Sequence, residues 1–107
     1  MCPELFDLSI IIVNWNTQAL LADCLAAVDL TVRSSDQLSA EVLVVDNASI
    51  DDSISIVKSQ FPWVRLIENA ENAGFARANN QAMRIASGRY ILLLNSDTTM
   101  HLSLIHI

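Results

Sequence analysis

Glycine and cysteine are both scarce in this sequence, and each shortage excludes a class of site. The only glycines are Gly74 and Gly88, so the sequence contains neither a GxGxxG nor a GxxxxGKS/T phosphate-binding loop. The only cysteines, Cys2 and Cys24, form no CxxC pair and lie far from the two histidines near the C-terminus. This ligand count excludes a zinc site, and a disulfide framework is not expected. A reducing compartment is therefore the expected setting.

Basic residues and long apolar runs are scarce as well. Six Lys and Arg against twelve Asp and Glu give a net charge of −6, which argues against non-specific nucleic-acid binding because that binding neutralises phosphates with cations. The longest apolar runs, such as Ile10–Val13 and Tyr90–Leu94, are four or five residues long, whereas a membrane span needs ~20. The N-terminal MCPELFD lacks the order of a signal peptide. We expect a cytoplasmic protein with no nucleic-acid partner and no transmembrane segment.

Apolar residues, in contrast, are plentiful enough for a buried core. They make up 52% of the 107 residues, which rules out a disordered chain and provides for one domain or part of a larger one. A chain of this size hides roughly 60–70% of its unfolded surface. A fragment of a larger domain would therefore be only marginally stable and prone to aggregate.

Four apolar runs alternate with segments of helical periodicity. We predict strands over the following segments: Leu8–Asn14, Glu41–Val45, Val64–Glu68 and Tyr90–Leu94. Runs without polar alternation fit strands that are buried on both faces. The alternation predicts an α/β fold, with a parallel Rossmann-like sheet, helices on both faces and right-handed crossovers.

Two helix boundaries are predicted from short motifs. Ser49, followed three positions later by Asp52, resembles a capping box and predicts the start of the second helix. The third helix is predicted over Phe75–Ser87, with Gly88 as its left-handed C-terminal cap.

Three of the four predicted strands end in polar clusters. The clusters are Asn14-Trp15-Asn16, Asp46-Asn47 and Asn95-Ser96-Asp97. Taken singly, such residues are ordinary turn and cap residues. A parallel topology brings the carboxyl ends of the strands to one edge, where such sheets bind their ligands. We therefore expect the three clusters to converge on one site.

The residue types in these clusters fit a nucleotide. Asp46 and Asn47 offer acceptors and donors to a base edge or to ribose hydroxyls, and Trp15 offers an aromatic face, although a buried Trp at a strand end is an equally fair interpretation. Asp97 is a hard oxygen ligand for Mg²⁺ or Mn²⁺. Because no glycine loop can hold a diphosphate, a metal is expected to do so. This favours a metal-dependent sugar-nucleotide enzyme over a dehydrogenase or a P-loop NTPase.

Four blocks of sequence together resemble a known family. They are SIIIVNWN (Ser9–Asn16), VLVVDNASIDDS (Val42–Ser53), ENAGFARANNQA (Glu71–Ala82) and ASGRYILLLNSDT (Ala86–Thr98). In this order and spacing they look like the N-terminal half of a family 2 glycosyltransferase of GT-A fold. The residues of these blocks are most similar to those of rhamnosyltransferase-like members that build cell-surface polysaccharide.

The resemblance implies a role for each matching position. The implied nucleotide-binding residues are Val13, Asn14, Trp15, Asp46, Asn47, Asn72, Gly74, Asn79, Asn95 and Ser96. The implied metal ligand is Asp97, which would hold Mg²⁺ or Mn²⁺. Asn47 and Asn95 stand where the family has acids, and Asn79 stands where many members have Arg, a role for which Arg77 is an alternative. The catalytic base is expected in a C-terminal half beyond this chain.

The resemblance also implies a reaction. The full-length protein would transfer a sugar from dTDP-rhamnose or a UDP-sugar to a glycan or lipid-linked glycan acceptor, by an inverting, metal-assisted mechanism. Residues 1–100 would be the donor-nucleotide half, inactive alone, and residues 101–107 (HLSLIHI) a non-native or disordered tail. Peripheral association of the full-length protein with the inner membrane face stays open.

Three other protein classes share some of these sequence features. A non-catalytic nucleotide-binding remnant would have the same residues. A phosphoreceiver-like signalling domain would need an acidic pair after the first strand, where this chain has Asn14 and Asn16. A sugar-nucleotide pyrophosphorylase would need a glycine-rich basic loop there, and the sequence has none.

Overall fold

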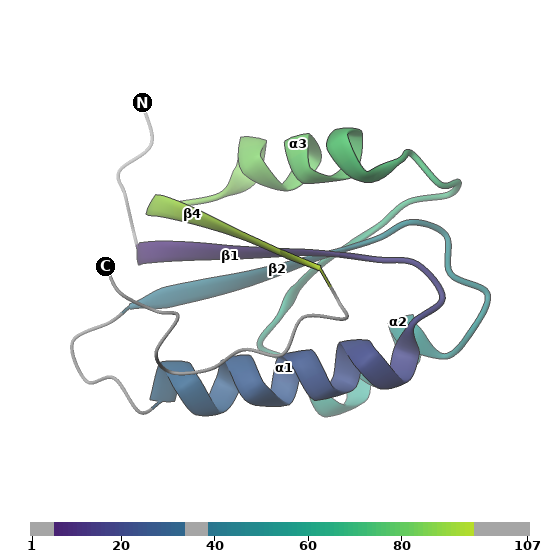
Figure 1. The fold of residues 1–107 in the computed structure, drawn as a ribbon, viewed down its shortest axis with the longest axis horizontal. Coiled ribbons are helices and arrows are strands. Elements are labelled where there is room, and N and C mark those ends of the chain that lie inside the picture. The colour runs from purple at the N-terminus through teal and green to yellow at the C-terminus, as the bar shows by residue number, and fades with distance from the viewer. Residues whose placement is uncertain (1–5, 34–38, 96–107) are drawn as a thin grey trace.

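Strands and helices alternate along the computed structural model, which describes residues 6–33 and 39–95. The elements are β1 (Phe6–Asn14), α1 (Gln18–Arg33), β2 (Ala40–Asp46), α2 (Ser53–Gln60), β3 (Arg65–Glu68), α3 (Phe75–Ile85) and β4 (Gly88–Asn95). The described strands make one parallel sheet in the order β3-β2-β1-β4. Helices α1 and α2 cover one face of this sheet and α3 covers the other (Figure 1). The predicted α/β sheet with helices on both faces is confirmed.

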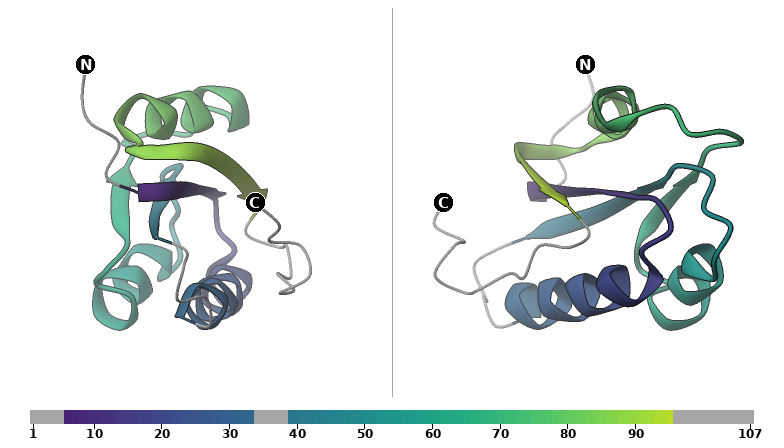
Figure 2. Two further views of the ribbon diagram at one scale, coloured as in Figure 1. Left: turned by 90° about the vertical axis from the view of Figure 1, so that its left-hand side faces the viewer. Right: turned by 45° about the vertical axis from the view of Figure 1, so that its right-hand side comes forward.

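The central strands are buried on both faces because helices pack on each side of the sheet (Figure 2). On the α1 and α2 face, Ile10 and Ile12 share a cluster with Leu25 of α1. On the other face, Ile11 packs with Ala78 of α3. Successive side chains of a strand point to opposite faces, so a run that is apolar at every position supplies both clusters. Burial of one such isoleucine contributes about 1.5–3 kcal/mol.

The strand β4 is less completely covered. Leu92 and Leu94 pack against the cluster on the α1 and α2 face. Tyr90, Ile91 and Leu93 are 53%, 44% and 45% exposed. Within the described part of the chain, β4 pairs with β1 and lies at the edge of the sheet. An edge strand with exposed apolar side chains favours self-association.

Gly88 begins β4 and does not cap α3, so the prediction of a left-handed cap at this position is wrong. Helix α3 ends at Ile85, and its C-cap residue Ala86 is extended, with φ −67° and ψ 138°. A Cβ at position 88 would lie 2.5 Å from the backbone nitrogen of Ser9. Glycine is needed there because β4 approaches β1 closely. This is a tertiary contact, so the local sequence cannot predict it.

The predicted capping box is also wrong. Helix α2 begins at Ser53, and its N-cap residue Asp52 makes no side-chain capping bond. Ser49 lies outside the helix, where its Oγ donates to Asp46 Oδ1 over 2.7 Å. The N–H and Oγ of Ser53 donate to Asp51 Oδ1 over 3.0 and 2.5 Å. Asp51 therefore holds the start of α2, while Ser49 belongs to a network in the preceding loop.

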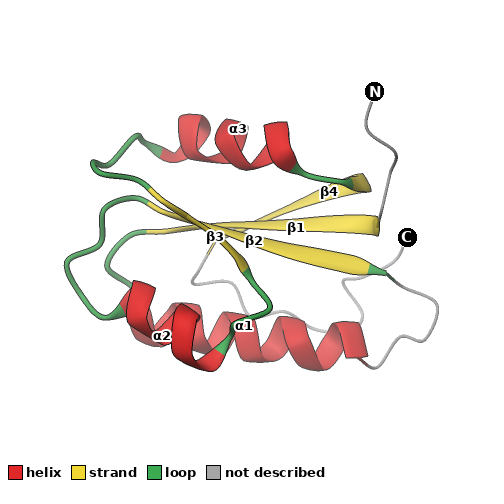
Figure 3. Ribbon diagram, turned by 180° about the vertical axis from the view of Figure 1, so that it is seen from behind, coloured by secondary structure: helices red, strands yellow, loops and turns green. Residues whose placement is uncertain are grey.

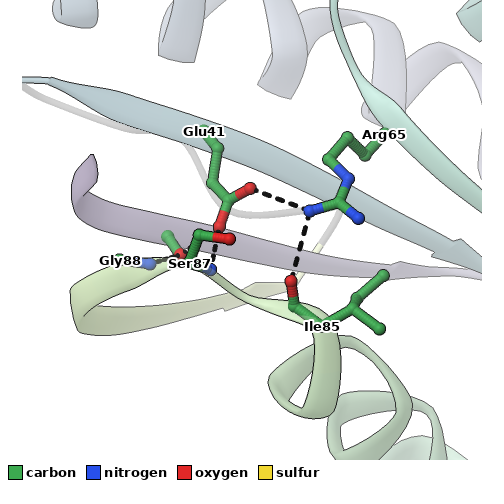
Figure 4. A network of polar contacts seen from close by, with 6 residues as sticks. Glu41, Arg65, Ile85, Ser87 and Gly88 are labelled. Carbon is green, nitrogen blue, oxygen red and sulfur yellow. Dashed lines mark hydrogen bonds and ion pairs between the residues drawn. The ribbon is translucent and has the colours of Figure 1, made fainter. Parts of the chain in front are cut away.

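A buried carboxylate joins four segments at the amino ends of the strands (Figure 4). Glu41 is 6% exposed, and it accepts hydrogen bonds from Ser9 Oγ, over 2.6 Å, and from the N–H of Ser87. Its Oε1 lies 3.1 Å from Arg65 Nη1. Arg65 Nη1 also donates to the carbonyl of Ile85 over 3.2 Å. This network fixes the junction of α3 and β4.

The surroundings of Glu41 keep it ionised. Burial raises the pKa of the Glu41 carboxyl, but the hydrogen bonds from Ser9 and Ser87 and the guanidinium of Arg65 outweigh it. The pKa therefore lies below its usual value of 4.5. A buried charge with these partners is costly to leave unpaired, so the network is a stability element at the end of the sheet opposite to the polar clusters.

Candidate functional site

The carboxyl ends of the strands meet at one end of the sheet, as predicted. Asn14 of β1 is paired with Asp46 of β2, and Asp46 is paired with Glu68 of β3. Val13 is paired with Asn95, the last residue of β4. Viewed from behind, the loops that follow β1, β2 and β3 gather at this end (Figure 3). The strand positions of the predicted nucleotide site therefore lie side by side.

Asp46 fixes the loops that follow β1 and β2. It is 1% exposed, and its Oδ1 accepts from Asn14 Nδ2 over 3.0 Å and from Ser49 Oγ over 2.7 Å. Its Oδ2 accepts from the N–H of Ser49 over 2.8 Å. Asn14 is held in turn by Thr17, whose Oγ1 donates to Asn14 Oδ1 over 2.6 Å. The carboxylate thus joins two loops, while its contact with a base or ribose stays a prediction.

Four further hydrogen bonds, which we call the loop bridge, join the same two loops. The N–H of Asn16 donates to Ser49 Oγ over 2.9 Å, and the N–H of Ile50 donates to Asn16 Oδ1 over 2.8 Å. Two residues further on, Gln18 repeats this reciprocal pattern. Its N–H donates to Asp51 Oδ2 over 3.1 Å, and its Oε1 accepts from the N–H of Asp52 over 2.8 Å.

The carboxylate of Asp51 is part of both the loop bridge and the start of α2. Burial raises the pKa of Asp51, but hydrogen bonds from the Ser53 hydroxyl, the Ser53 N–H and the Gln18 N–H outweigh it. The pKa of Asp51 therefore lies below its usual value of 3.8. Asp51 stays charged at neutral pH and accepts bonds from both loops.

Asn47 holds a different loop, the one between β3 and α3. It is 2% exposed. Its Oδ1 accepts from Asn69 Nδ2 over 2.9 Å and from the N–H of Ala73 over 3.3 Å, and its Nδ2 donates to the carbonyl of Gly74 over 3.4 Å. Asn69 also exchanges two amide bonds with Gln81 of α3. Asp46 and Asn47, adjacent in sequence, therefore organise loops that lead to helices on opposite faces of the sheet.

Asn72 and Gly74 shape the approach to α3. Asn72 is exposed, and its Oδ1 accepts from the N–H of Gly74 over 2.8 Å. Gly74 is the N-cap residue, with φ 83° and ψ 164° and no side-chain capping bond. This region of φ and ψ is essentially restricted to glycine. The amino end of α3 is thereby left without a capping side chain, at the same end of the sheet as the polar clusters.

Trp15 is the most accessible large side chain among the strand-end positions. Its side chain is 55% exposed, so the interpretation of Trp15 as a buried residue at a strand end is wrong. The neighbouring Val13 is half-buried and packs at the margin of the cluster under α3. Asn14, between them, is fully buried. An apolar surface flanked by buried polar groups therefore faces solvent at this edge.

Asn79 and Arg77 lie on different sides of α3. Asn79 is 4% exposed, and its Oδ1 has no hydrogen-bond partner in the part of the chain that the structure describes. Arg77 is exposed and lines an open groove of about 590 Å³ on the outside of α3, together with Gly74 and Arg84. Because positions two apart on a helix point about 200° apart, Arg77 cannot occupy the space of Asn79.

The predicted metal ligand Asp97 and the neighbouring Ser96 lie outside the described residues. Asn95 ends β4, and its backbone is paired beside Val13. Within residues 6–33 and 39–95, no three His, Cys, Asp or Glu residues are grouped so that they could hold a metal. The carboxylate of Asp46 is occupied by the loop bonds described above.

Several residues of the site were not predicted from sequence. They are Gln18, Ser49, Asp51, Asn69 and Gln81, all of which hold loops by side-chain bonds. One signal was present in the sequence: Asn16 and Gln18 share the two-residue spacing of Ser49 and Asp51. Side-chain acceptors at the same spacing after two neighbouring parallel strands can pair in register. The pairing of Asn69 with Gln81 has no comparable signal.

Of the helices that the structure describes, none is long and apolar enough to cross a membrane.

Several relatives match most of this chain, two of them glucosyltransferases by name. The poly(ribitol-phosphate) beta-glucosyltransferase of Bacillus spizizenii is 36% identical over 95 residues, which cover 84% of this chain and 14% of the relative. The UDP-Glc:alpha-D-GlcNAc-diphosphoundecaprenol beta-1,3-glucosyltransferase WfaP of Escherichia coli is 34% identical over 90 residues, which cover 83% of this chain and 34% of the relative. The chain therefore spans about a third or less of the length of these relatives.

Solved structures share the fold. S. aureus TarS 1-349, also solved in complex with UDP-GlcNAc, superposes with a TM-score of 0.78 at 23% identity, over 92% of this chain. The match covers 29% of the TarS chain without ligand and 28% of that with UDP-GlcNAc. The mannosyltransferase PcManGT from Pyrobaculum calidifontis, in complex with GDP-Man and Mn²⁺, has a TM-score of 0.73 at 26% identity, over 91% of this chain and 30% of its own. The sheet and its helices are those of the GT-A glycosyltransferases.

The family itself follows from the sequence match. The model of the family described as Glycosyl transferase family 2 matches residues 9–106, which is most of this chain. This chain belongs to glycosyl transferase family 2.

Proposed function

We propose that this chain carries the donor-nucleotide site of a glycosyltransferase, at the carboxyl end of its parallel sheet. The observation that carries the proposal is the half-exposed indole of Trp15 beside the buried pair of Asn14 and Asp46. Parallel α/β sheets bind ligands at this end. Trp15 is a member of neither core cluster, so its exposed face is available to stack on a nucleotide base.

Other residues are proposed to contact the base, the ribose and the diphosphate of the nucleotide. Val13 and Trp15 would lie along the base, and Asn95 and Ser96 would contact the ribose or the diphosphate. The start of α3, with Asn72 and Gly74, would face the diphosphate, because an uncapped helix N-terminus offers free N–H groups to an anion.

Three buried residues are proposed to serve the site through their neighbours. Asn14, Asp46 and Asn47 are each at most 2% exposed, so little of their surface can reach a ligand directly. Their proposed contribution is to hold the loops that carry Trp15 and Gly74. Asn79 is also buried, at 4% exposure, and its Oδ1 lacks a partner among the described residues, so its proposed contribution to the nucleotide site is made through the start of α3.

The donor is proposed to be a UDP-sugar, with dTDP-rhamnose as the alternative. In support, the name of WfaP includes UDP-Glc, and TarS was solved with UDP-GlcNAc. The acceptor is proposed to be a glycan or a lipid-linked glycan. The names of two relatives, which include poly(ribitol-phosphate) and diphosphoundecaprenol, support an acceptor of this kind. The full-length protein is proposed to build a cell-surface polymer in the cytoplasm, at the inner membrane face.

A divalent cation, Mg²⁺ or Mn²⁺, is proposed to act with the donor through Asp97. PcManGT was solved with Mn²⁺ and GDP-Man. The described residues do not themselves fit a cation, because no cluster of three His, Cys, Asp or Glu residues is found within residues 6–33 and 39–95. A bound cation would stabilise the negative charge of a departing diphosphate.

The reaction is proposed to be an inverting transfer in the full-length protein. An acceptor hydroxyl would attack the anomeric carbon, its proton would pass to a base, and the nucleoside diphosphate would leave with the electrons of the broken bond. Asp46 and Asp51 are unsuited as that base because their carboxylates already accept two or more internal hydrogen bonds. The base is proposed to come from the rest of the full-length protein, and nucleotide binding without transfer is the second candidate for the chain alone.

The test is a calorimetric titration of the 107-residue chain with UDP and with dTDP, in the presence of Mg²⁺ or Mn²⁺. The proposal predicts binding by the wild-type chain that is weakened in Trp15→Ala and Asp97→Ala. Trp63→Ala is the matched control, because Trp63 is also half-exposed but packs edge-on against Phe61, before the amino end of β3 and away from the carboxyl ends of the strands. Equal affinity of Trp15→Ala and Trp63→Ala would refute the site.

A further inference from the structure

The residues on either side of Trp15 are held by polar contacts. On one side, the Asn14 side chain is fixed by Asp46 and Thr17. On the other side, Asn16 has φ 53°, in the left-handed region. Asparagine tolerates this region better than most residues. Trp15 therefore lies between two asparagines, one held by side-chain bonds and the other in the left-handed region.

Asn16 is held from the neighbouring loop by two bonds of the loop bridge. Its N–H donates to Ser49 Oγ and its Oδ1 accepts from the N–H of Ile50, which lies 34 positions later in the chain. The bonds engage both the main chain and the side chain of Asn16. A rotation of Asn16 out of its left-handed conformation would therefore break both.

Gln18 extends the bridge to the starts of both helices. Its N–H donates to Asp51 and its Oε1 accepts from the N–H of Asp52. Asp52 is the N-cap residue of α2, and Gln18 is the first residue of α1. The loop that carries Trp15 is thereby fixed relative to two helices that the core holds in place.

The loop bridge buries little apolar surface. Ile50, at its centre, is 92% exposed, and the partners of the bridge are exposed or only partly buried. The net contribution of such bonds to stability is small and must offset the entropy of ordering the loops. Their main effect is to restrict conformation beside an exposed indole. A pre-organised contact surface binds a ligand more tightly than a mobile one.

We propose that Asn16 and Gln18 are positioning residues: the loop bridge that they form holds the Trp15 indole in the orientation that stacks on the donor's base. This inference rests on the proposed function, because it takes the base as the ligand of Trp15. Neither residue needs to touch the nucleotide. Loss of either side chain should weaken nucleotide binding through the mobility of Trp15.

The experiment uses Trp15 fluorescence in the 107-residue chain. The sequence has two tryptophans, so a Trp63→Phe background leaves Trp15 as the only reporter. In this background we compare Asn16→Gly, which keeps access to positive φ but loses Oδ1, with Asn16→Asp, which keeps both. Gln18→Ala removes the second reciprocal acceptor. The stability control is Glu41→Gln, at the opposite end of the sheet.

Two readouts separate positioning from stability. Steady-state anisotropy of Trp15 without ligand should fall in Asn16→Gly and Gln18→Ala and stay unchanged in Asn16→Asp and Glu41→Gln. The Kd for UDP or dTDP, from quenching of Trp15, should rise about fivefold for each lost hydrogen bond of about 1 kcal/mol. Thermal unfolding shows whether the variants remain folded under the assay conditions.

The outcomes distinguish the inference from the proposed function. Lower anisotropy with a higher Kd in Asn16→Gly, rescued in Asn16→Asp, supports the inference. Unchanged anisotropy in a folded Asn16→Gly overturns it, as does a Kd that follows only the unfolding temperature across all variants. If neither nucleotide quenches Trp15 in the parent, the proposed base contact fails. The anisotropy comparison then still decides whether the loop bridge holds Trp15.

Discussion

Asn14 Nδ2 donates to Asp46 Oδ1 over 3.0 Å, and this bond joins the ends of the two central strands of the sheet. Both residues are buried, at 0% and 1% exposure. The strands themselves are held together by backbone ladders and by apolar packing. The Asn14–Asp46 bond transmits that rigidity into the two loops, one of which carries the exposed Trp15.

Asp46 is predicted to be a stability residue of the site. In Asp46→Ala, three donors from Asn14 and Ser49 lose their acceptor, and we expect a loss of about 2–4 kcal/mol in the free energy of unfolding. The matched control is Glu68→Ala, at the paired position of β3. Among the described residues, the side chain of Glu68 forms an exposed ion pair with Lys58 over 3.1 Å, which contributes at most about 1 kcal/mol. Urea unfolding measures both variants, and equal losses would contradict the role of Asp46.

Asn47 is predicted to be required as an amide. Asn47→Asp restores the acid that the family resemblance leads one to expect, and it keeps the acceptor for Asn69 and Ala73. It loses the donor to the carbonyl of Gly74 and places a carboxylate beside that carbonyl. We expect a loss of about 1 kcal/mol in unfolding free energy at pH 7, which becomes smaller at low pH as the new carboxyl is protonated. A variant as stable as the wild type at pH 7 would show that the Gly74 contact contributes nothing.

The two glycines are predicted to resist substitution for different reasons. Gly74→Ala meets no atom within 4 Å but must adopt φ 83°, a strain of about 1–2 kcal/mol. Gly88→Ala would bring its Cβ to 2.5 Å from the backbone of Ser9, and relief of that clash requires movement of β4 away from β1. We expect the larger loss of stability, about 3 kcal/mol, in Gly88→Ala. Thermal unfolding gives the order, and the reverse order would contradict the close approach of β4 and β1.

Glu41 is predicted to make stability depend on pH in the acid range. Its pKa is lowered in the folded state from its usual value of 4.5. The unfolded chain therefore binds the proton more readily, so the stabilisation is fully present above the unfolded pKa and is lost as pH falls through the folded pKa. The free energy of unfolding should decline as pH falls below about 4.5.

The Glu41→Gln variant isolates this effect. It should be less stable than the wild type at pH 7 and should show a shallower decline below about pH 4.5, because one linked proton has been removed. Asp51, whose pKa is also lowered, remains in the variant and supplies a residual slope. Urea unfolding across the acid range measures both slopes. Identical slopes for Glu41→Gln and the wild type would show that Glu41 does not contribute.

The fold could be predicted from the sequence because many residues contribute to its pattern of apolar runs and helical segments. A run such as Ile10–Val13 is apolar at every position and so requires cover on both faces of the sheet. Three such runs separated by helical segments leave few alternatives to a parallel sheet. The meeting of Asn14, Asp46 and Asn95 at one edge follows from that topology alone and is confirmed by the register.

The functions of individual polar residues could not be predicted in the same way. In the sequence, Asp46 and Asn47 look like a pair of ligands, yet their side chains hold different loops. Their hydrogen-bond partners lie up to 32 positions away in the sequence, so the local sequence does not reveal them. Ser49 reads as a helix cap, but its hydroxyl bonds Asp46. In the sequence, Gly88 looks like a helix terminator, but glycine is required there because a Cβ would clash with Ser9. In each case a tertiary contact decides between roles that the local sequence supports equally.

The most direct test of nucleotide binding at the carboxyl end of the sheet is an amide NMR titration of the ¹⁵N-labelled 107-residue chain with UDP and Mg²⁺. We predict that the shifted amides cluster at Trp15 and Asn16, in the loop after Asp46, and around Gly74 at the start of α3. The amides of Glu41 and Ser87, at the opposite end of the sheet, should not shift. Shifts centred on Glu41 and Ser87, or none at saturating UDP, would contradict the proposed site.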